Sequence, residues 1–199
     1  MLAQKSPDLE EIRDALQEIV DEDNRAGEVI NRLRRLLKKG ERTQESVNIN
    51  DLVRSTASLL HSELVSREIS VKLDLENRVL AATGDSVQLQ QVLLNLVMNA
   101  MDAMASTPMA SRQILISTRK MEGGAVEVMV KDRGHGIPPT DSVRLFEPFY
   151  TTKENGLGLG LSICSTIIET HGGKLTLVSD DGGGAIARFW LPAQKTAVP

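Results

Sequence analysis

The sequence contains 199 residues, 41% hydrophobic and 25% charged, which is enough for one buried core and an appended segment. Its formal net charge of −4 argues against a general binder of nucleic acid or of membrane surfaces. The single cysteine, Cys164, excludes a disulfide framework and a cysteine metal cluster, so we interpret it as a buried thiol. The N-terminus is too polar for a signal peptide and no apolar run could span a bilayer, so we expect a cytoplasmic location without membrane contact.

Residues 6–40 carry the pattern of one long helix. Ser6 is a suitable N-cap, Pro7 suits the first helical position, and 38–40 (Lys-Lys-Gly) supplies cations and a glycine for the helix end. Between them, apolar residues recur at alternating steps of three and four and form a heptad seam: Leu9, Ile12, Leu16, Ile19, Ala26, Ile30, Leu33 and Leu37. A helix of about 30 residues would be roughly 45 Å long.

So long an apolar stripe favours a partner helix, and we expect a homodimer formed through this N-terminal helix. Packing of the helix on its own domain is the alternative. Asp23 interrupts the seam, and it either fixes the register of the pairing or marks the end of a shorter partner helix.

The polar stretch 41–46 predicts a linker, so 1–46 would be helix and linker, 47–192 an α/β domain and 193–199 a C-terminal tail. Within the domain, apolar runs and alternation predict strands at 47–49, 69–75, 79–82, 113–121, 125–131, 175–179 and 185–191. Helical periodicity predicts helices at about 50–68, 86–104 and 158–170. Asn50 or Asp51 is the expected cap of the first helix, and 122–124 (Glu-Gly-Gly) is the expected turn of a hairpin.

Asn95 and Asn99 lie four residues apart in the predicted helix 86–104, so both amides share one face. Two amide oxygens on one face can hold a hard cation such as Mg²⁺, which keeps water and phosphate oxygens among its ligands. A solvated face is the alternative, and the glycine motifs later in the chain favour the metal site.

Asp132 follows the predicted strand 125–131, where a sheet edge opens into a loop. Gly134 and Gly136 would allow the backbone to approach a flat ligand. A carboxylate at this place can accept a hydrogen bond from the exocyclic amine of adenine, whereas guanine offers a carbonyl there. An ordinary turn is the alternative, because Asp-x-Gly is common in turns.

The segment 156–160 (Gly-Leu-Gly-Leu-Gly) leads directly into the predicted helix 158–170. Backbone N–H groups at a helix start bind anions, and glycines let phosphates come close. The spacing matches neither the dinucleotide fingerprint nor the P-loop. We interpret the interleaved leucines as hinge and anchor contacts: Leu157, Leu159 and Leu161.

The segment 146–153 (Phe-Glu-Pro-Phe-Tyr-Thr-Thr-Lys) precedes this glycine motif. Phe146 and Phe149 could pin a mobile segment, and Lys153 could reach the terminal phosphates; a solvated lysine is the alternative. The histidines lack metal-ligand spacing and are expected to be structural or exposed: His61, His135 and His171.

Taken in order, these motifs resemble the catalytic and ATP-binding domain of sensor histidine kinases, which is shared with the gyrase, Hsp90 and MutL ATPases. Residues 89–104 match the asparagine box of that family, 132–137 the first glycine box, 146–149 the phenylalanine box and 156–161 the second glycine box. The resemblance implies a Bergerat fold, an α/β two-layer sandwich with a mixed sheet on three helices and a lid at about 138–157.

The resemblance also implies residue roles. Asn99 would bind Mg²⁺ with support from Asn95, Asp132 would recognise adenine, and Asn95 and Lys153 would serve the transfer step. Further contacts to ATP would come from the matched boxes and the segment between them: Gly134, Gly136, Ile137, Phe149, Thr152, Lys153, Gly156, Leu157, Gly158, Leu159, Gly160 and Leu161.

Two departures shape the predicted function. Gyrase-like hydrolases carry a glutamate at the position of Asn95, and an amide cannot take a proton, so transfer is favoured over fast hydrolysis. The phosphoacceptor box of the family is absent, and 6–40 resembles only the second helix of its dimerising hairpin. We therefore expect a fragment, an engineered chain or a kinase that acts on a His-bearing partner.

The sequence thus predicts a protein-histidine kinase module that passes the γ-phosphoryl group of ATP to a histidine on a phosphotransfer domain, for onward transfer to a response-regulator aspartate. It would belong to the cytoplasmic part of a larger sensor and would not phosphorylate itself in isolation. The alternatives are a gyrase/MutL-like ATPase clamp and a dimeric scaffold that binds nucleotide without kinase activity.

Overall fold

The computed structural model describes residues 13, 44–78, 80–138, 140–141, 144–153 and 156–193. Apart from Arg13, which is helical, the predicted helix 6–40 lies outside these residues, as does most of the predicted tail 193–199.

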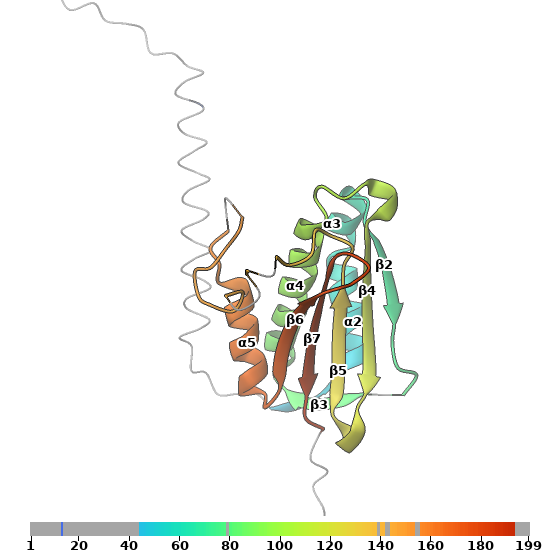
Figure 1. The fold of residues 1–199 in the computed structure, drawn as a ribbon. Helices are drawn as coiled ribbons and strands as arrows, with labels where there is room; N and C mark the ends of the chain where they lie inside the picture. Colours follow the sequence, from blue (N-terminus) through green and yellow to red (C-terminus); the bar gives the residue numbers. More distant parts are fainter. Residues whose placement is uncertain are drawn as a thin grey trace, which may run out of the picture. The chain divides into compact units, whose positions relative to one another are not determined.

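The described part alternates helices with strands (Figure 1). The strands are β1 (Glu45–Asn48), β2 (Ser70–Asp74), β3 (Ala81–Gly84), β4 (Gln113–Lys120), β5 (Val126–Lys131), β6 (Lys174–Ser179) and β7 (Ala185–Leu191). The α-helices are α2 (Ile49–Leu59), α3 (His61–Ser66), α4 (Ser86–Ala103) and α5 (Gly160–Thr170). Short 3₁₀ turns, η1 (Met109–Ser111) and η2 (Glu122–Gly124), flank β4.

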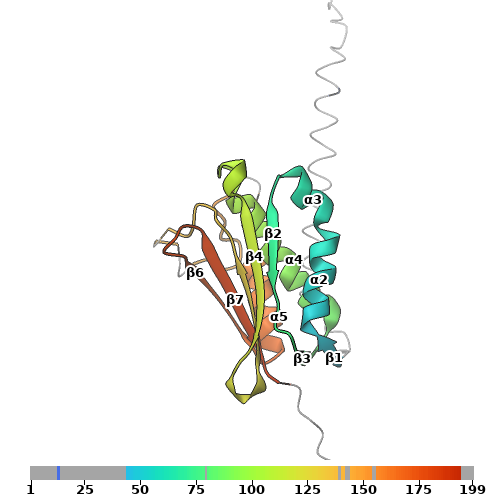
Figure 2. The same ribbon diagram turned by 90° about the vertical axis from the view of Figure 1, so that its right-hand side faces the viewer.

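Five of the strands form one mixed sheet in the order β2-β4-β5-β7-β6. β2 runs parallel to β4, and the other neighbours are antiparallel. β1 and β3 form a separate two-stranded antiparallel sheet. Seen from the side, the large sheet makes one layer and the helices α2, α4 and α5 make the second (Figure 2). The predicted α/β two-layer sandwich with three covering helices is confirmed.

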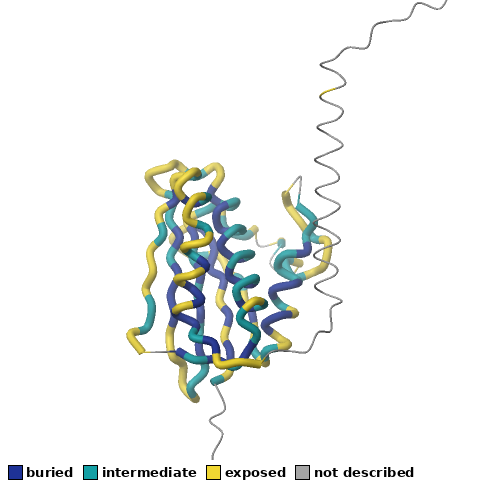
Figure 3. The backbone as a smooth tube through the Cα atoms, turned by 180° about the vertical axis from the view of Figure 1, so that it is seen from behind, coloured by how far each residue is buried: buried dark blue, intermediate teal, exposed yellow. Residues whose placement is uncertain are grey.

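The core lies between these layers, where α4 presents its apolar face to the sheet. The apolar residues of that face are all buried: Leu89, Val92, Leu93, Leu96, Val97 and Ala100. The inward residues of β4 and β5 are buried as well, while their neighbours along each strand are more exposed. Figure 3 shows the buried stretches running along the helices and the central strands. This packing holds α4 rigidly, and α4 carries the polar residues of the site.

The first predicted helix, 50–68, is wrong as one element, because the structure has two helices with a break at Leu60. Its cap is Asn48 rather than Asn50 or Asp51: the Asn48 side chain accepts from the backbone N–H groups of Asn50 and Asp51. Asn50 is instead buried, and its amide accepts from Thr118 Oγ1 at 2.7 Å and donates to Glu76 O at 2.9 Å. The Asn50 side chain is engaged by Thr118, which is distant in sequence, and is therefore not available to cap the helix. Local sequence patterns cannot reveal such a contact.

Other element bounds differ as well. The strand predicted at 47–49 is found at Glu45–Asn48, so it begins inside the predicted linker 41–46. The strand predicted at 79–82 is found at 81–84, since its position is set by antiparallel pairing with β1, in which Val47 lies opposite Ala82. The helix predicted from 158 begins at Gly160, because Gly158 has a φ of +65° and cannot continue a right-handed helix. Among the described residues, no helix is long and apolar enough to cross a bilayer.

Candidate functional site

The candidate site is built around the polar side chains on one face of α4. Asp85 caps this helix by accepting from the N–H groups of Val87 and Gln88. Asn95, Asn99 and Asp102 then follow on successive turns, half-buried, on the side away from the apolar face. The predicted amide pair is therefore on one face of one helix, and a carboxylate, which the sequence analysis did not single out, extends it.

Asp132 lies directly after β5, at the edge predicted for it, and is only 6% exposed. Its Oδ1 accepts from the N–H of Gly134 at 2.7 Å and from the N–H of Ala185 at 3.2 Å. Among the contacts of the described residues, none engages Oδ2. Burial raises the pKa of this carboxyl group above its ordinary value, although the two backbone hydrogen bonds oppose the rise. One oxygen is thus held rigidly, and the other can accept from a ligand.

The loop after Asp132 is fastened to two neighbouring elements. A Cβ on Gly134 would lie 2.6 Å from the carbonyl oxygen of Ala103, at the end of α4, and His135 N donates to that same oxygen at 3.2 Å. Farther along, Ile137 N donates to Ser179 Oγ at 3.1 Å, and that hydroxyl donates to Ile137 O at 2.9 Å. The loop therefore bridges α4 and the end of β6.

The structure gives the glycines of this loop a role within the fold. The space beside Gly134 is filled by the protein's own backbone at Ala103, and Gly136 (φ +74°) lies against the carbonyl of Gly184. Gly184 (φ +90°) is itself close to Asp132, with a position for Cβ only 2.2 Å from the Asp132 carbonyl oxygen. These glycines allow chain segments to approach one another, and the result is a fixed Asp132.

Asn95 lies one turn before Asn99 and faces the start of α5. Its side chain contacts Cys164, and a Cβ on Gly160 would lie 3.9 Å from its Oδ1. Cys164 is fully buried, and burial raises the pKa of its thiol to about 12, with the contact from Asn95 opposing the rise. The predicted burial of this thiol is therefore confirmed. No side chain caps α5, so the N–H groups of its first turn face outward from the start of the helix.

The segment before α5 closes on itself. Phe149 N donates to Gly158 O at 3.0 Å, and a Cβ on Gly158 would lie 2.4 Å from the backbone of Phe149. Arg144 stacks on the ring of Tyr150, 4.4 Å from its centroid. Phe146 packs against the core, as predicted, but Phe149 is 70% exposed with a φ of +68°, so the prediction that it pins the segment is wrong. Its backbone, rather than its ring, makes the closing contact.

The second glycine motif has the anchoring role predicted for its leucines. Leu159 is buried, and Leu157 and Leu161 pack against the core. Gly156 lies beside Thr151, where a Cβ would be 2.4 Å from the hydroxyl oxygen. Thr152 is exposed.

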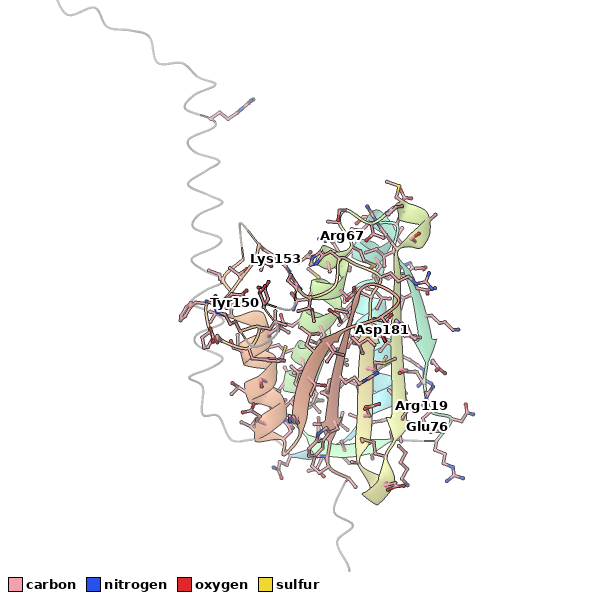
Figure 4. The ribbon with its side chains drawn as sticks, viewed as in Figure 1. Arg67, Glu76, Arg119, Tyr150, Lys153 and Asp181 are labelled. Atoms are coloured by element: carbon pink, nitrogen blue, oxygen red, sulfur yellow. The ribbon has the colours of Figure 1, made fainter. Side chains whose placement is uncertain are left out.

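Lys153 extends from this segment to α4 (Figure 4). Its Nζ donates to Asn99 Oδ1 at 3.1 Å and to Asp102 Oδ2 at 2.6 Å. Arg67 Nη1 donates to the other oxygen of Asp102 at 2.8 Å. Burial raises the pKa of Asp102, but the hydrogen bonds from Lys153 and Arg67 outweigh it and hold the pKa below its usual value. The Lys153 side chain is paired with Asp102 and is still 45% exposed, so it is partly solvated.

Sequence reasoning missed Asp102 and Arg67. Asp102 could have been found, because a position three residues after Asn99 shares its helix face. Arg67 follows α3 and meets Asp102 only in the folded chain, so no local signal marks it. His171 is structural, as expected: its Nε2 accepts from Asp85 N at 3.0 Å and its Nδ1 donates to Ile167 O at 2.7 Å.

The donor set suits Mg²⁺. Asn99 Oδ1 already accepts from an ammonium group at 3.1 Å, so this oxygen points to a place where a cation is stabilised. Amide and carboxylate oxygens with space for water and phosphate are the ligands that Mg²⁺ prefers. Among the described ranges, no group of three or more His, Cys, Asp or Glu side chains is gathered as a metal site, which leaves no dense cluster of the kind that binds Zn²⁺.

Comparison with known proteins agrees with this geometry. The family model described as histidine kinase-, DNA gyrase B- and HSP90-like ATPase matches residues 84–195, and the chain belongs to this family. The sensor histidine kinase TmoS of Ectopseudomonas mendocina is 35% identical over 96% of this chain and 20% of its own length. The sensor protein FixL of Bradyrhizobium diazoefficiens is 34% identical over 94% of this chain and 37% of its own length. The chain thus spans between a fifth and two fifths of these two relatives.

Solved structures place the match in one domain. The catalytic domain of the histidine kinase ThkA is 34% identical, with a TM-score of 0.67, covering 77% of this chain and 97% of that domain. ThkA in complex with the response regulator TrrA is 28% identical, with a TM-score of 0.76, over 96% of this chain and 54% of ThkA. The described fold is therefore that of the ATP-binding catalytic domain of sensor histidine kinases.

Proposed function

We propose that this chain binds Mg-ATP and transfers its γ-phosphoryl group to a histidine on a phosphotransfer segment outside these 199 residues, for onward transfer to a response-regulator aspartate. The proposal rests on the carboxylate of Asp132, which has one oxygen hydrogen-bonded within the fold and the other without a partner among the described residues. Its Oδ1 is held by two backbone N–H groups, which leaves Oδ2 to accept from the exocyclic amine of adenine. The residue is only 6% exposed, and a hydrogen bond in such a poorly solvated place is stronger than one in water.

The rest of the nucleotide would follow the polar face of α4 from Asp132. Mg²⁺ would be held by Asn99 with support from Asn95, and the phosphates would meet Lys153 and the first turn of α5. When bound, Mg²⁺ would neutralise charge on the triphosphate. In this assignment the chain's own groups position the γ-phosphoryl group and offset its charge, and no side chain forms a covalent bond to it.

Transfer, rather than hydrolysis, is supported by the residue at position 95. Asn95 has an amide where a hydrolase needs a base, and an amide does not take a proton from water. It contacts the thiol of Cys164, whose raised pKa keeps it protonated, so this neighbour is no base either.

None of the three histidines has the sequence context of the family's phosphoacceptor box. Both ring nitrogens of His171 are engaged within the fold, and Nδ1 of His135 contacts the carbonyl of Gly136. His61 is exposed at the start of α3. We propose that the acceptor lies on a separate His-bearing hairpin, and that residues 6–40, the second helix of such a hairpin, join two copies of the chain. ThkA, crystallised with TrrA, supports a response regulator as the further partner.

The proposal is tested with γ-labelled ATP and Mg²⁺. The purified chain is incubated alone and with a supplied His-bearing helical hairpin. We expect acid-labile, base-stable label on a hairpin and none on the chain itself. Label on the chain, or steady-state phosphate release without any hairpin, would contradict the proposal. Sedimentation with and without residues 1–40 tests the dimer, which should be lost in the shorter chain.

A further inference from the structure

Lys153 is anchored by two oxygens of α4, although it lies in a segment between two glycine-rich turns. Its ammonium group contacts Asn99 Oδ1 at 3.1 Å and Asp102 Oδ2 at 2.6 Å. The Lys153 side chain is 45% exposed and that of Asp102 35%. A lysine on a flexible four-carbon stem would otherwise sample many positions, so the two contacts select one of them.

Asp102 is in turn held from the other side. Arg67 donates through Nη1 to Asp102 Oδ1 at 2.8 Å and through Nε to Glu63 Oε1 at 2.7 Å. The backbone carbonyl of Arg67 accepts from Arg112 Nη1 at 2.8 Å. Figure 4 shows Arg67 and Lys153 at the same end of the helical layer. A chain of contacts thus runs from α3 through Asp102 to Lys153, and each carboxylate oxygen of Asp102 has one cationic partner.

Lys153 keeps an N–H donor for an anion, because an ammonium group has three donors and two are engaged, by Asn99 and Asp102. Within this network the two carboxylates of Glu63 and Asp102 balance the two cations. The ammonium also lies within hydrogen-bond distance of Asn99 Oδ1, the oxygen assigned to Mg²⁺, and therefore beside the expected path of the triphosphate. If Asn99 Oδ1 held Mg²⁺, the ammonium group of Lys153 would lose this acceptor and would keep its hydrogen bond to Asp102.

We propose that Asp102 is a positioning residue: it holds the Lys153 ammonium beside Asn99, where it meets the γ-phosphate of ATP. This inference rests on the proposed function. It predicts that Asp102 contributes to binding only through Lys153, and only for a nucleotide with a third phosphate. The diphosphate, which ends before that position, is bound equally well with or without Asp102.

The test is the affinity of the whole chain for Mg-ATP and for Mg-ADP, measured by calorimetry. In Asp102→Asn we expect the preference for ATP over ADP to fall about threefold, the range of a partly exposed ion pair. In Lys153→Met we expect a loss of about tenfold, since a charged contact to phosphate disappears. Asp102→Glu retains the carboxylate and should recover part of the preference.

The decisive measurement is the double variant, Asp102→Asn with Lys153→Met. If Asp102 acts through Lys153, the double variant has the same ATP preference as Lys153→Met alone. Further loss in the double variant, or an equal loss of ATP and ADP affinity in Asp102→Asn, overturns the inference. Asp74→Asn is the matched control, because Asp74 also forms a partly exposed ion pair, with Arg119 on the β2–β4 side of the sheet. Failure of the unaltered chain to bind either nucleotide would instead refute the proposed function.

Discussion

Replacement of Asp132 by Asn tests the adenine contact with little disturbance of the fold. The Asn side chain keeps an oxygen that can accept from Gly134 N and Ala185 N, at the 2.7 Å and 3.2 Å positions now held by Oδ1. Only Oδ2 changes, from an acceptor to an N–H₂ donor. That donor would face the amine of adenine, which is also a donor, so the contact is lost while the loop stays in place.

A hydrogen bond to a charged group contributes about 1.5–3 kcal/mol, which corresponds to a loss of affinity of roughly 10- to 100-fold. Calorimetry with ADP and with ATP should show the same factor for both, because the base is common to them. GDP should gain relative to ADP, since its carbonyl can accept from the new amide. Equal affinity of the variant and the unaltered chain for ADP would refute the assignment of Asp132.

Stability provides the control for this variant. Burial raises the pKa of Asp132 in the folded chain. Its carboxyl group therefore stays protonated at a pH where the same group in the unfolded chain, with a pKa of about 4, is ionised. The free energy of unfolding should therefore fall as the pH rises from about 4 through the folded pKa, and this contribution should be constant above it. Asp132→Asn removes this contribution, so denaturant titrations should show a stability at neutral pH at least equal to that of the unaltered chain. A variant that is less stable at neutral pH would make the binding result uninterpretable as a local contact.

Two further predictions concern packing around the site. Gly184→Ala should lower the free energy of unfolding by about 3 kcal/mol or more in denaturant titrations, because the new Cβ would lie 2.2 Å from the Asp132 carbonyl. Gly183→Ala is its matched control: its φ is similar, +92° against +90°, but nothing lies within 4 Å, so a loss of about 1 kcal/mol is expected. Equal losses would show that the close approach to Asp132 is unimportant. Cys164 should resist thiol reagents in the folded chain at pH 8 and react only on unfolding, given burial and a pKa of about 12; prompt labelling of the folded chain would contradict this.

Local patterns were sufficient for the elements that make the sandwich. α4 was predicted almost to the residue, because its apolar face, its cap at Asp85 and its helical period all agree. The hairpin of β4 and β5 was likewise predicted from alternation on both sides of a glycine turn. The predicted start of the first helix was wrong because a residue distant in sequence is involved: the Asn50 amide accepts a hydrogen bond from Thr118 and does not cap the helix.

In the site, too, local sequence patterns predicted some features, while others depend on contacts between residues distant in sequence. Asn95 and Asn99 were placed on one helix face by their spacing alone, and Asp132 was placed at a strand end by the apolar run before it. The spacing said nothing of the contact between Lys153 and α4, or of the role of Arg67, since these partners are 51 and 35 residues from Asp102 in the chain. Nor could it show that Gly134 lies too close to the backbone of Ala103 for a Cβ.

The amino-acid sequence by itself determined which chemical groups this protein has and on which face of each element they lie, because periodicity within a helix or strand depends only on near neighbours. The tertiary structure alone decided which of those faces meet. Contacts such as Lys153 to Asp102 depend on how the elements pack, and packing is settled by the shape of the whole core.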